Sequence, residues 1–380
     1  MTRYVHELPG WPHLRWDQKK LAVPLAALRH RQGRLVGRME TLGFSLRAEA
    51  TLRTLTLDVL KSSEIEGEIL DRDQVRSSIA RRLGMDVGGL TAADRNVEGV
   101  VEMMLDATQN YGAPLTAERL FGWHAALFPT GYSGMRKIAI GRWRDDSRGP
   151  MQVVSGPLGR ERVHFEAPAA TRLKKEMAAF LKWFNGTDQT DLVLRAGLAH
   201  LWFVTIHPFE DGNGRIARAI ADMTLARSEQ SAQRFYSMSA QIRTERKTYY
   251  EMLEKTQESG LDVTPWLEWF LACLDRAFDG TEETLGSVLQ KARFWEAHAA
   301  TLLNDRQRQM LNKLLDRFEG KLTSSKWAKI MKCSQDTALR DILDLVNHGI
   351  LVKDAAGGRS TSYSLAQKRE TGTSGGTMSN

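Results

Sequence analysis

The chain has 380 residues, of which 42% are hydrophobic and 26% charged, and its formal net charge at pH 7 is +7. That length allows two or three domains with a large core, and the composition is ordinary for a globular protein in water. The positive charge is a weak bias towards acidic partners such as nucleotides, and it does not by itself indicate DNA binding.

No segment approaches about 18 consecutive apolar residues, and the first residues form no apolar signal core, so we expect no membrane association and no secretory leader. The two cysteines, Cys273 and Cys333, are far apart and form no CxxC motif. This spacing argues against a disulfide framework or a zinc site. The expected location is therefore the reducing cytoplasm.

Residues 1–94 predict an N-terminal helical domain. Residues 1–24 are rich in Trp, Pro and charged residues, which predicts an extended arm held by its aromatic side chains. From Leu25 to Leu83 apolar residues recur at helical spacing. Asp71 is well placed to cap the helix that follows it.

Residues 95–279 predict a second, mainly helical domain that contains one β-hairpin. Between 129 and 168 the sequence changes to Gly, Pro, Arg and β-forming residues. Two short runs, 151–156 and 162–165, flank a glycine-bearing turn, which is a pattern typical of a hairpin. Helical spacing resumes after this region.

The remainder predicts a connection followed by a small domain. Residues 280–305 are a predicted linker and helix, with Gly280–Ser287 as the linker. Residues 306–366 predict three helices and then two short strands, which is the order of elements in a winged helix. The tail, 367–380, is rich in Ser, Thr and Gly and is predicted to be disordered.

The densest group of polar residues is the segment His207-Pro-Phe-Glu-Asp-Gly-Asn-Gly-Arg215, which lies between two apolar segments with helical patterns. Pro208 and the two glycines interrupt the helical pattern, so this central motif predicts a loop between two buried helices. Polar loops held by rigid elements are where functional sites are usually found.

The residue types in the central motif indicate phosphate chemistry. Its glycine-rich half stands where a helix begins, so unpaired N–H groups and the helix dipole predict an anion site for a di- or triphosphate. Arg215 and Arg218 share a helical face and suit phosphate contacts. Asp211 is a hard oxygen donor suited to Mg²⁺ beside phosphates. His207 is suited to removing a hydroxyl proton near neutrality.

Each of these features alone is weak. A histidine before proline is more often a helix-terminal polar residue than a base, and short glycine motifs are common. The full set at fixed offsets favours a phosphate site over a purely structural loop.

The central motif resembles the signature HPFx[D/E]GN[G/K]R of Fic-domain proteins and matches it at every defined position. The resemblance covers roughly residues 95–275. It implies transfer of AMP from ATP to a Ser, Thr or Tyr hydroxyl of a target protein and of the protein itself. It implies these roles: His207 as the base, Asp211 on Mg²⁺, and Gly212, Asn213, Gly214, Arg215 and Arg218 on the phosphates. Members that transfer a phosphoryl group instead have Lys at the position of Gly214, so this glycine favours nucleotidyl transfer.

The Fic family also has a β-hairpin "flap" that holds the target segment by main-chain pairing. Residues 150–165 resemble this flap. The alternative is a structural hairpin with a solvated basic face. We favour the flap because an isolated hairpin is poorly stable without something to pair or pack with.

A second motif, Ser62-Ser-Glu-Ile-Glu66-Gly67, resembles the inhibitory pattern [S/T]xxxE[G/N] of Fic regulation. Ser62 and Glu66 share a helical face, and Gly67 permits close approach. The resemblance implies that Glu66 pairs with Arg218 and keeps it from the γ-phosphate. Taken alone, the segment is typical of a solvated helix face. In some relatives the same Glu orients water for removal of AMP, so the net direction of the reaction is open.

Two other groups of residues have open interpretations. Tyr249 and Tyr250 belong either to the nucleoside pocket or to the core, and we include Tyr250 among the nucleotide-binding residues. Arg136, Arg142 and Arg144 are either target contacts or, as we expect, part of a solvated basic loop.

The C-terminal module leaves a rival function open. A winged helix binds DNA through its third helix, here Gln335–Val346, with its wing on the backbone near Arg359. Asp336, Asp341 and Asp344 on that helix disfavour phosphate contact, so a protein partner is the alternative. The rival to an enzyme is a nucleotide-sensing, DNA-binding regulator. The oligomeric state is open, a homodimer included.

Together these observations predict a mainly α protein with a Fic-type helical core, a β-hairpin flap, an N-terminal helical domain and a C-terminal winged helix. The predicted function is that of a protein adenylyltransferase that uses ATP and Mg²⁺ and is auto-inhibited by Glu66.

Overall fold

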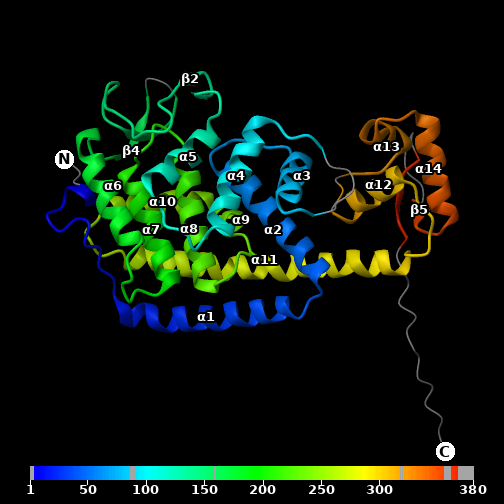
Figure 1. The fold of residues 1–380 in the computed structure, drawn as a ribbon, viewed down its shortest axis with the longest axis horizontal. Helices are drawn as coiled ribbons and strands as arrows, with labels where there is room; N and C mark the ends of the chain where they lie inside the picture. Colours follow the sequence, from blue (N-terminus) through cyan, green and yellow to red (C-terminus); the bar gives the residue numbers. More distant parts are fainter. Residues whose placement is uncertain are drawn as a thin grey trace, which may run out of the picture. The chain divides into compact units, whose positions relative to one another are not determined.

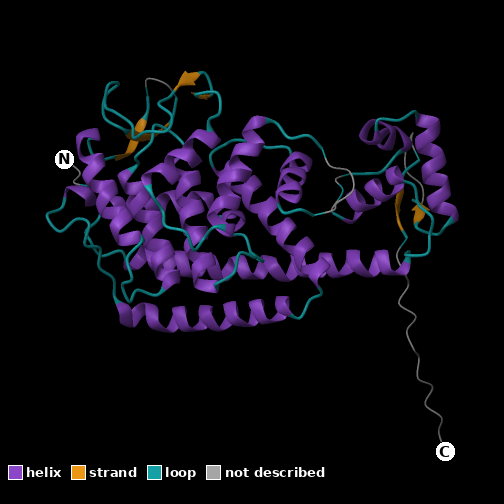
Figure 2. Ribbon diagram, viewed as in Figure 1, coloured by secondary structure: helices purple, strands orange, loops and turns teal. Residues whose placement is uncertain are grey.

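The computed structural model describes residues 4–85, 91–157, 160–316, 318, 320–354 and 361–366. Among these residues the fold is mainly helical, with three small two-stranded hairpins (Figures 1 and 2). The predicted mainly α fold class is confirmed. The chain divides into two compact units, residues 1–288 and 289–380. No helix within the described ranges is long and apolar enough to cross a membrane.

The first unit begins with helices and has its strands in the middle. Its elements up to the second hairpin are η1 (Val5–Glu7), α1 (Gln18–Glu40), α2 (Phe44–Ile65), α3 (Arg72–Arg82), α4 (Arg95–Gln109), α5 (Ala117–Leu127), β1 (Tyr132–Ser133), β2 (Arg136–Lys137), β3 (Gln152–Ser155) and β4 (Arg162–Glu166). The helices that follow are α6 (Ala170–Phe184), α7 (Leu192–Ile206), α8 (Asn213–Glu229), α9 (Met238–Thr244), α10 (Arg246–Gln257) and α11 (Thr264–Ala297).

Helices α7 and α8 form the centre of the first unit. Every residue of α7 after Leu192 is buried, and a helix buried all round lies inside a protein rather than on its surface. Helix α7 packs along α8, and α8 also contacts α2, α4 and α5. In Figure 1 these two green helices lie among the other helices of the unit. The loop between them, 207–212, is therefore positioned by a rigid core.

Side-chain caps fix where several helices begin. Asp71 accepts a hydrogen bond from the Gln74 N–H at 2.9 Å, which confirms the predicted cap of α3. Asp94 and Thr116 cap α4 and α5 in the same way. These caps satisfy N–H groups that a helix cannot pair internally.

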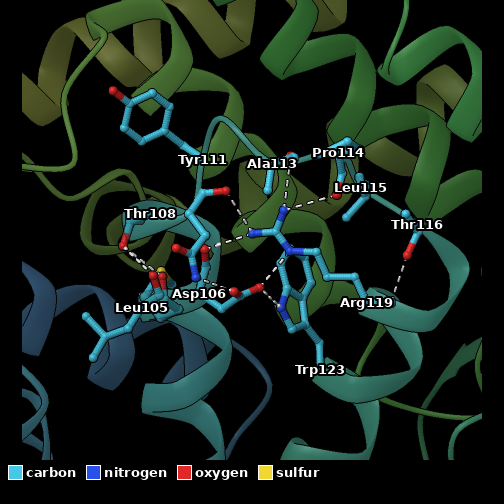
Figure 3. A network of polar contacts seen from close by, with 12 residues as sticks. Leu105, Asp106, Thr108, Tyr111, Ala113, Pro114, Leu115, Thr116, Arg119 and Trp123 are labelled. Carbon is cyan, nitrogen blue, oxygen red and sulfur yellow. Dashed lines mark hydrogen bonds and ion pairs between the residues drawn. The ribbon is translucent and has the colours of Figure 1, made fainter.

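A close approach and a shared carboxylate join α4 to α5. A Cβ on Gly99 would lie 1.7 Å from the Ala126 carbonyl oxygen, so only glycine fits at this crossing. Asp106 accepts hydrogen bonds from Arg119 Nε at 2.6 Å and from Trp123 Nε1 at 2.7 Å (Figure 3). Arg119 also donates to backbone carbonyls of the turn at 110–114. The network fixes the turn that leads into α5.

The predicted hairpin is confirmed as the antiparallel pair β3–β4. Gln152 pairs with Glu166 and Ser155 with Arg162, and a bulge shifts the register between Val153 and Val154. Residues 158 and 159 of the glycine-bearing turn lie outside the described residues. A smaller hairpin, β1–β2, precedes it and was not predicted.

Helix α11 corrects the predicted linker. Gly280–Ser287 lies inside this helix, which runs without interruption from Thr264 to Ala297. Each of the two glycines in this segment, at 280 and 286, costs a helix only ~1 kcal/mol relative to alanine, which is too little to end a helix whose flanking turns are well formed. The division between the two units also falls within α11. The predicted domain boundaries, 1–94 and 95–279, stay predictions.

The second unit has a core of its own. After α11 it contains α12 (Asp305–Leu315), α13 (Ser324–Met331), α14 (Gln335–Asn347), β5 (Leu351–Lys353) and β6 (Tyr363–Leu365). Leu311, Trp327 and Ile342 are buried together in this core, and β5 pairs antiparallel with β6. This is the predicted order of three helices and a hairpin, and the winged-helix assignment itself stays a prediction. Arg359 and the tail, 367–380, lie outside the described residues.

Candidate active site

The loop between α7 and α8 opens onto a cavity of about 870 Å³. Its walls come from the end of α2, the β3–β4 hairpin, the loop itself, the start of α8 and α10. Seven of the predicted site residues line it: Glu66, His207, Asp211, Gly212, Asn213, Gly214 and Tyr250. The structure thus brings the central motif, the predicted flap and the predicted inhibitory segment to one place.

His207 ends α7 in the left-handed region, with φ 50° and ψ 58°. Its Nδ1 lies 3.2 Å from the Val204 carbonyl oxygen. Because a carbonyl only accepts hydrogen bonds, Nδ1 carries the proton and donates it. In the neutral ring the lone pair is then on Nε2, which is the form that a general base requires.

Burial lowers the pKa of His207 to about 4, and the nearby positive charge of Arg144 acts in the same direction. The imidazole is therefore neutral at physiological pH. A neutral ring with a defined tautomer is ready to accept a proton as soon as a substrate hydroxyl is placed beside it.

Arg144 holds the backbone at His207. Its Nε donates to the His207 carbonyl oxygen at 2.8 Å, and its own N–H donates to the Pro208 carbonyl oxygen at 2.9 Å. Arg144 is buried and pairs with Asp146 at 2.8 Å. Our expectation of a solvated loop is therefore wrong for this arginine, because its donors complete the turn after α7. Arg136 and Arg142 are exposed, as expected.

Two residues fold the loop back on itself. The Asn213 side chain donates to the Phe209 carbonyl oxygen at 2.8 Å and accepts from the Phe209 N–H at 3.0 Å. Gly212 has a φ of +80°, and a Cβ there would lie 2.9 Å from the Phe128 ring. A side chain at this position would be strained and would lack space. The Asn213 side chain shapes the loop, so its predicted phosphate contact is left to its backbone N–H.

The start of α8 has the features of an anion site. Among the residues that the structure describes, no side chain caps this helix at its N-cap, Gly212, so the N–H groups of its first turn and the helix dipole are available to a ligand. In the described part of the chain, Arg218 Nη1 and Arg215 Nε are buried donors without a hydrogen-bond partner. Unsatisfied buried donors are costly, and phosphate oxygens are acceptors that would satisfy them.

Asp211 supplies a carboxylate beside this anion site. It accepts hydrogen bonds from the Ser133 hydroxyl and from the Gly212 N–H. Within the described ranges, no group of three or more His, Cys, Asp or Glu residues forms a metal cage. One carboxylate next to a phosphate site is the donor set with which proteins commonly hold Mg²⁺, the phosphates and water completing its coordination. The residues present therefore fit such an ion.

The predicted inhibitory segment contacts α8 directly. Arg218 Nη2 donates to the Glu66 carboxylate at 2.8 Å and to the Ser62 carbonyl oxygen at 2.8 Å, and its Nε donates to Ser62 Oγ at 2.9 Å. Arg218 is 2% exposed and Ser62 is fully buried, so the bonds between these two residues are shielded from water. Gly67 follows with φ +86°, a conformation in which glycine is favoured. A Cβ on Gly214 would lie 2.2 Å from the Glu66 carboxylate, so glycine is needed for this contact.

A second acidic residue of the same segment was missed by the sequence analysis. Glu68 accepts a hydrogen bond from Arg215 Nη1 at 2.5 Å. Both arginines that were expected to hold phosphates are therefore paired with glutamates that are two residues apart in the chain. The only sequence signal was the alternation of Glu64, Glu66 and Glu68, which predicts charge but not which partner each glutamate takes.

The two tyrosines of α10 differ in role. Tyr249 is 1% exposed and its hydroxyl lies 2.8 Å from His200 Nε2, so it belongs to the core behind the cavity. Tyr250 lines the cavity, and Arg246 stacks over its ring and donates to the Ile65 carbonyl oxygen. This pair holds the end of α2. Nucleoside contact by Tyr250 stays a prediction.

Comparison with known proteins identifies the family of the segment that contains the central motif. Residues 114–225 match the Fic/DOC family model, and this range contains the hairpin β3–β4 and the motif from His207 to Arg218. The chain contains a Fic domain. Residues 4–85 match a second model, described as a domain of unknown function (DUF4172), and this range contains Glu66.

Curated relatives of the Fic domain are similar over part of their length. Protein adenylyltransferase Fic of Nematostella vectensis is 33% identical over 114 residues, which are 30% of this chain and 25% of that protein. The protein of the same name from Drosophila melanogaster is 31% identical over 132 residues, 33% of this chain and 25% of that protein. The matches thus span about a quarter of these relatives.

Solved structures extend the likeness in fold. A Fic family protein from Desulfovibrio desulfuricans G20 has a TM-score of 0.50 and 22% identity, and the match covers 91% of this chain and 97% of that chain. A Fic-domain-containing signaling protein from Bacteroides thetaiotaomicron VPI-5482 also has a TM-score of 0.50, with 19% identity over 68% of this chain and 96% of that chain. The Fic fold therefore agrees with the helical arrangement around α7 and α8.

Proposed function

We propose that this Fic-domain protein transfers AMP from ATP to a Ser, Thr or Tyr hydroxyl of target proteins and of itself. The observation that carries the proposal is that His207, with its lone pair on Nε2, lines the same cavity as the uncapped start of α8. A base beside an anion site suits the attack of a hydroxyl on a phosphate. The name protein adenylyltransferase, carried by the relatives with similar Fic domains, supports the same reaction.

In the proposed reaction the target hydroxyl attacks the α-phosphorus in line with the pyrophosphate leaving group. His207 Nε2 accepts the hydroxyl proton as the new O–P bond forms. The N–H groups of the first turn of α8, together with Arg215 and Arg218, hold the phosphates and neutralise charge that develops on them. Asp211 is the residue that would hold Mg²⁺, which supplies further neutralisation of the polyphosphate when bound.

The proposed resting state is inhibited. Glu66 is bonded to Arg218, which the reaction needs for the outer phosphates. The Glu66 carboxylate also lies beside Gly214 in the anion site. A carboxylate there repels a phosphate and competes for the same donors. Helix α2 ends at this contact. Before its end it packs against α9, where the Ser237 hydroxyl donates to the buried Asp58 carboxylate at 2.5 Å. Release therefore requires movement of the α2 end, 65–68, rather than of the whole helix.

Removal of AMP from a modified protein is a second candidate for the same site. Glu66 and His207 line one cavity, and the Glu66 charge raises the pKa of His207 against the effect of burial. A carboxylate and an imidazole in one cavity can orient and deprotonate water as well as a hydroxyl. To test whether the protein removes AMP, AMP release from a modified substrate is measured with the protein that keeps Glu66.

The test is intact-mass measurement of casein, an external hydroxyl-bearing acceptor, after incubation with the Glu66→Gly protein, ATP and Mg²⁺. We expect a gain of AMP, which His207→Ala in that background reduces on the order of 100-fold or more while ATP binding persists. His30→Ala, at an exposed position of α1, is the matched control and should behave as the parent. Full activity without His207 contradicts its role as base. A salt-dependent DNA shift without AMP gain favours the rival DNA-binding regulator.

A further inference from the structure

The β3–β4 hairpin contains a second hydroxyl–imidazole–carboxylate arrangement, apart from the central motif. Ser155 Oγ lies 2.6 Å from His164 Nε2, and His164 Nδ1 lies 2.9 Å from a carboxylate oxygen of Glu254 on α10. A carboxylate only accepts, so Nδ1 carries the ring proton and Nε2 accepts the proton of the serine hydroxyl. A hydroxyl bonded to an imidazole, which a carboxylate orients in turn, is the arrangement of an activated nucleophile.

The attachment of the hairpin to α10 does not by itself explain the contact between Ser155 and His164. Glu254 already joins the two elements through His164 and through Arg162, whose guanidinium donates to its other oxygen. Ser155 and His164 belong to strands that are already paired through their backbones, so the bond between them adds little to that attachment. Its chemical effect is to place a lone pair of the imidazole on a serine hydroxyl.

Position distinguishes Ser155 from the other hydroxyls near the site. Ser155, His164 and Glu254 line the same cavity as His207 and the start of α8, and Ser155 is exposed. The Tyr249 hydroxyl also contacts an imidazole, but both rings are buried. The Ser133 hydroxyl is a donor to Asp211. The Tyr250 hydroxyl lies 3.4 Å from a Glu66 carboxylate oxygen and 3.5 Å from the Ile65 carbonyl oxygen, so it faces acceptors at the end of α2 rather than an imidazole.

We propose that Ser155 is the residue on which the protein modifies itself with AMP, a proposal that rests on the AMP transfer proposed above. Ser155 Oγ attacks the α-phosphorus of ATP, an O–P bond forms, and the bond from the α-phosphorus to the leaving oxygen of pyrophosphate breaks. His164 Nε2 takes the serine proton, and Glu254 orients the ring and stabilises its positive charge. Pyrophosphate leaves, and the product is a phosphodiester of AMP on the hairpin.

The experiment maps AMP on the full-length Glu66→Gly protein by peptide mass spectrometry after incubation with ATP and Mg²⁺, with casein added as an external hydroxyl-bearing acceptor. We expect AMP on the peptide that contains Ser155. Ser155→Ala should remove it, and Ser155→Thr, which keeps a hydroxyl, should restore it. Ser147→Ala, in the loop before the hairpin, is the matched control.

The role of His164 has its own measurement. His164→Asn should lower AMP on Ser155 relative to AMP on casein in the same reaction, on the order of 100-fold for loss of a general base. A merely structural change of the hairpin would lower both together, and that equal decrease overturns the role of His164. AMP on casein with none on Ser155 overturns this inference and leaves the proposed function standing. No AMP on either acceptor overturns both.

Discussion

Two glutamates of one short segment hold the two arginines that phosphates would need. The two ion pairs are similarly exposed, since the Glu66 side chain is 30% exposed and the Glu68 side chain 36%, each against a buried arginine. Glu66 differs in that it lines the cavity beside Gly214, and its partner Arg218 is also bonded to Ser62. We therefore expect the two contacts to contribute unequally to inhibition, with Glu66 dominant and Glu68 secondary.

Replacement of each glutamate should measure this difference. Loss of a charge-assisted bond of about 1.5–3 kcal/mol at Glu66→Gly should raise self-modification by AMP on the order of tenfold to 100-fold. Glu68→Gln breaks a partly exposed pair worth up to about 1 kcal/mol and should raise the rate about two- to fivefold. Glu102→Gln on α4, which removes the same charge from a pair with Arg82, is the control and should change nothing. Equal rates in the wild type and Glu66→Gly would refute inhibition by this segment.

The proton affinity of His207 gives a second prediction at this scale. Because burial lowers its pKa to about 4, the ring should stay neutral from pH 8 to about pH 5. Its NMR signals, identified by their loss in His207→Ala, should not shift over that range. Unfolding restores an ordinary pKa of about 6.5, so between about pH 6.5 and 4 the unfolded chain binds a proton that the folded chain does not. This group therefore lowers the free energy of unfolding as the pH falls through that window. An NMR midpoint near 6.5 in the folded protein would contradict the lowered pKa of His207.

At the scale of elements, local patterns predicted what local chemistry determines. The cap at Asp71, the helix–loop–helix of the central motif and the hairpin β3–β4 are all set by residues a few positions apart, and the structure confirms them. The contact of Glu66 with Arg218 was also expected, but from family resemblance rather than from spacing. Helix α11 shows the limit of local signals. The glycine at 280 suggested a linker, but the free-energy cost of a glycine in a helix is small compared with the stability of the helical turns around it.

Contacts between distant segments were beyond the sequence patterns. Arg144 completes the turn at His207 from 63 positions away, and an exposed loop was the natural expectation for an arginine in a segment rich in charged residues. Glu254 reaches His164 from α10, 90 positions away, and Ser155 alone gives no sign of an imidazole beside it. Such pairs depend on how elements pack, which periodicity and turn residues do not encode.

At the scale of the whole molecule, the two units have separate cores and should unfold separately. Trp266 is fully buried in the first unit and Trp327 in the second. Replacing a buried large aromatic residue by alanine costs about 3–5 kcal/mol, and the cost falls on the unit whose core loses the side chain. A chain with two cores need not unfold in one step.

Calorimetry of the full-length protein should therefore show two transitions. Trp327→Ala should lower the temperature of one of them and leave the other unchanged, and Trp266→Ala should do the reverse. In the Glu66→Gly background, Trp327→Ala should keep self-modification at temperatures at which the first unit is folded, because the cavity is lined by residues 66–257 alone. Trp266→Ala should lose activity at the same temperature as its transition. One transition that moves equally in both variants would instead show that the two cores unfold as a single cooperative structure, with activity in both variants ending at that temperature.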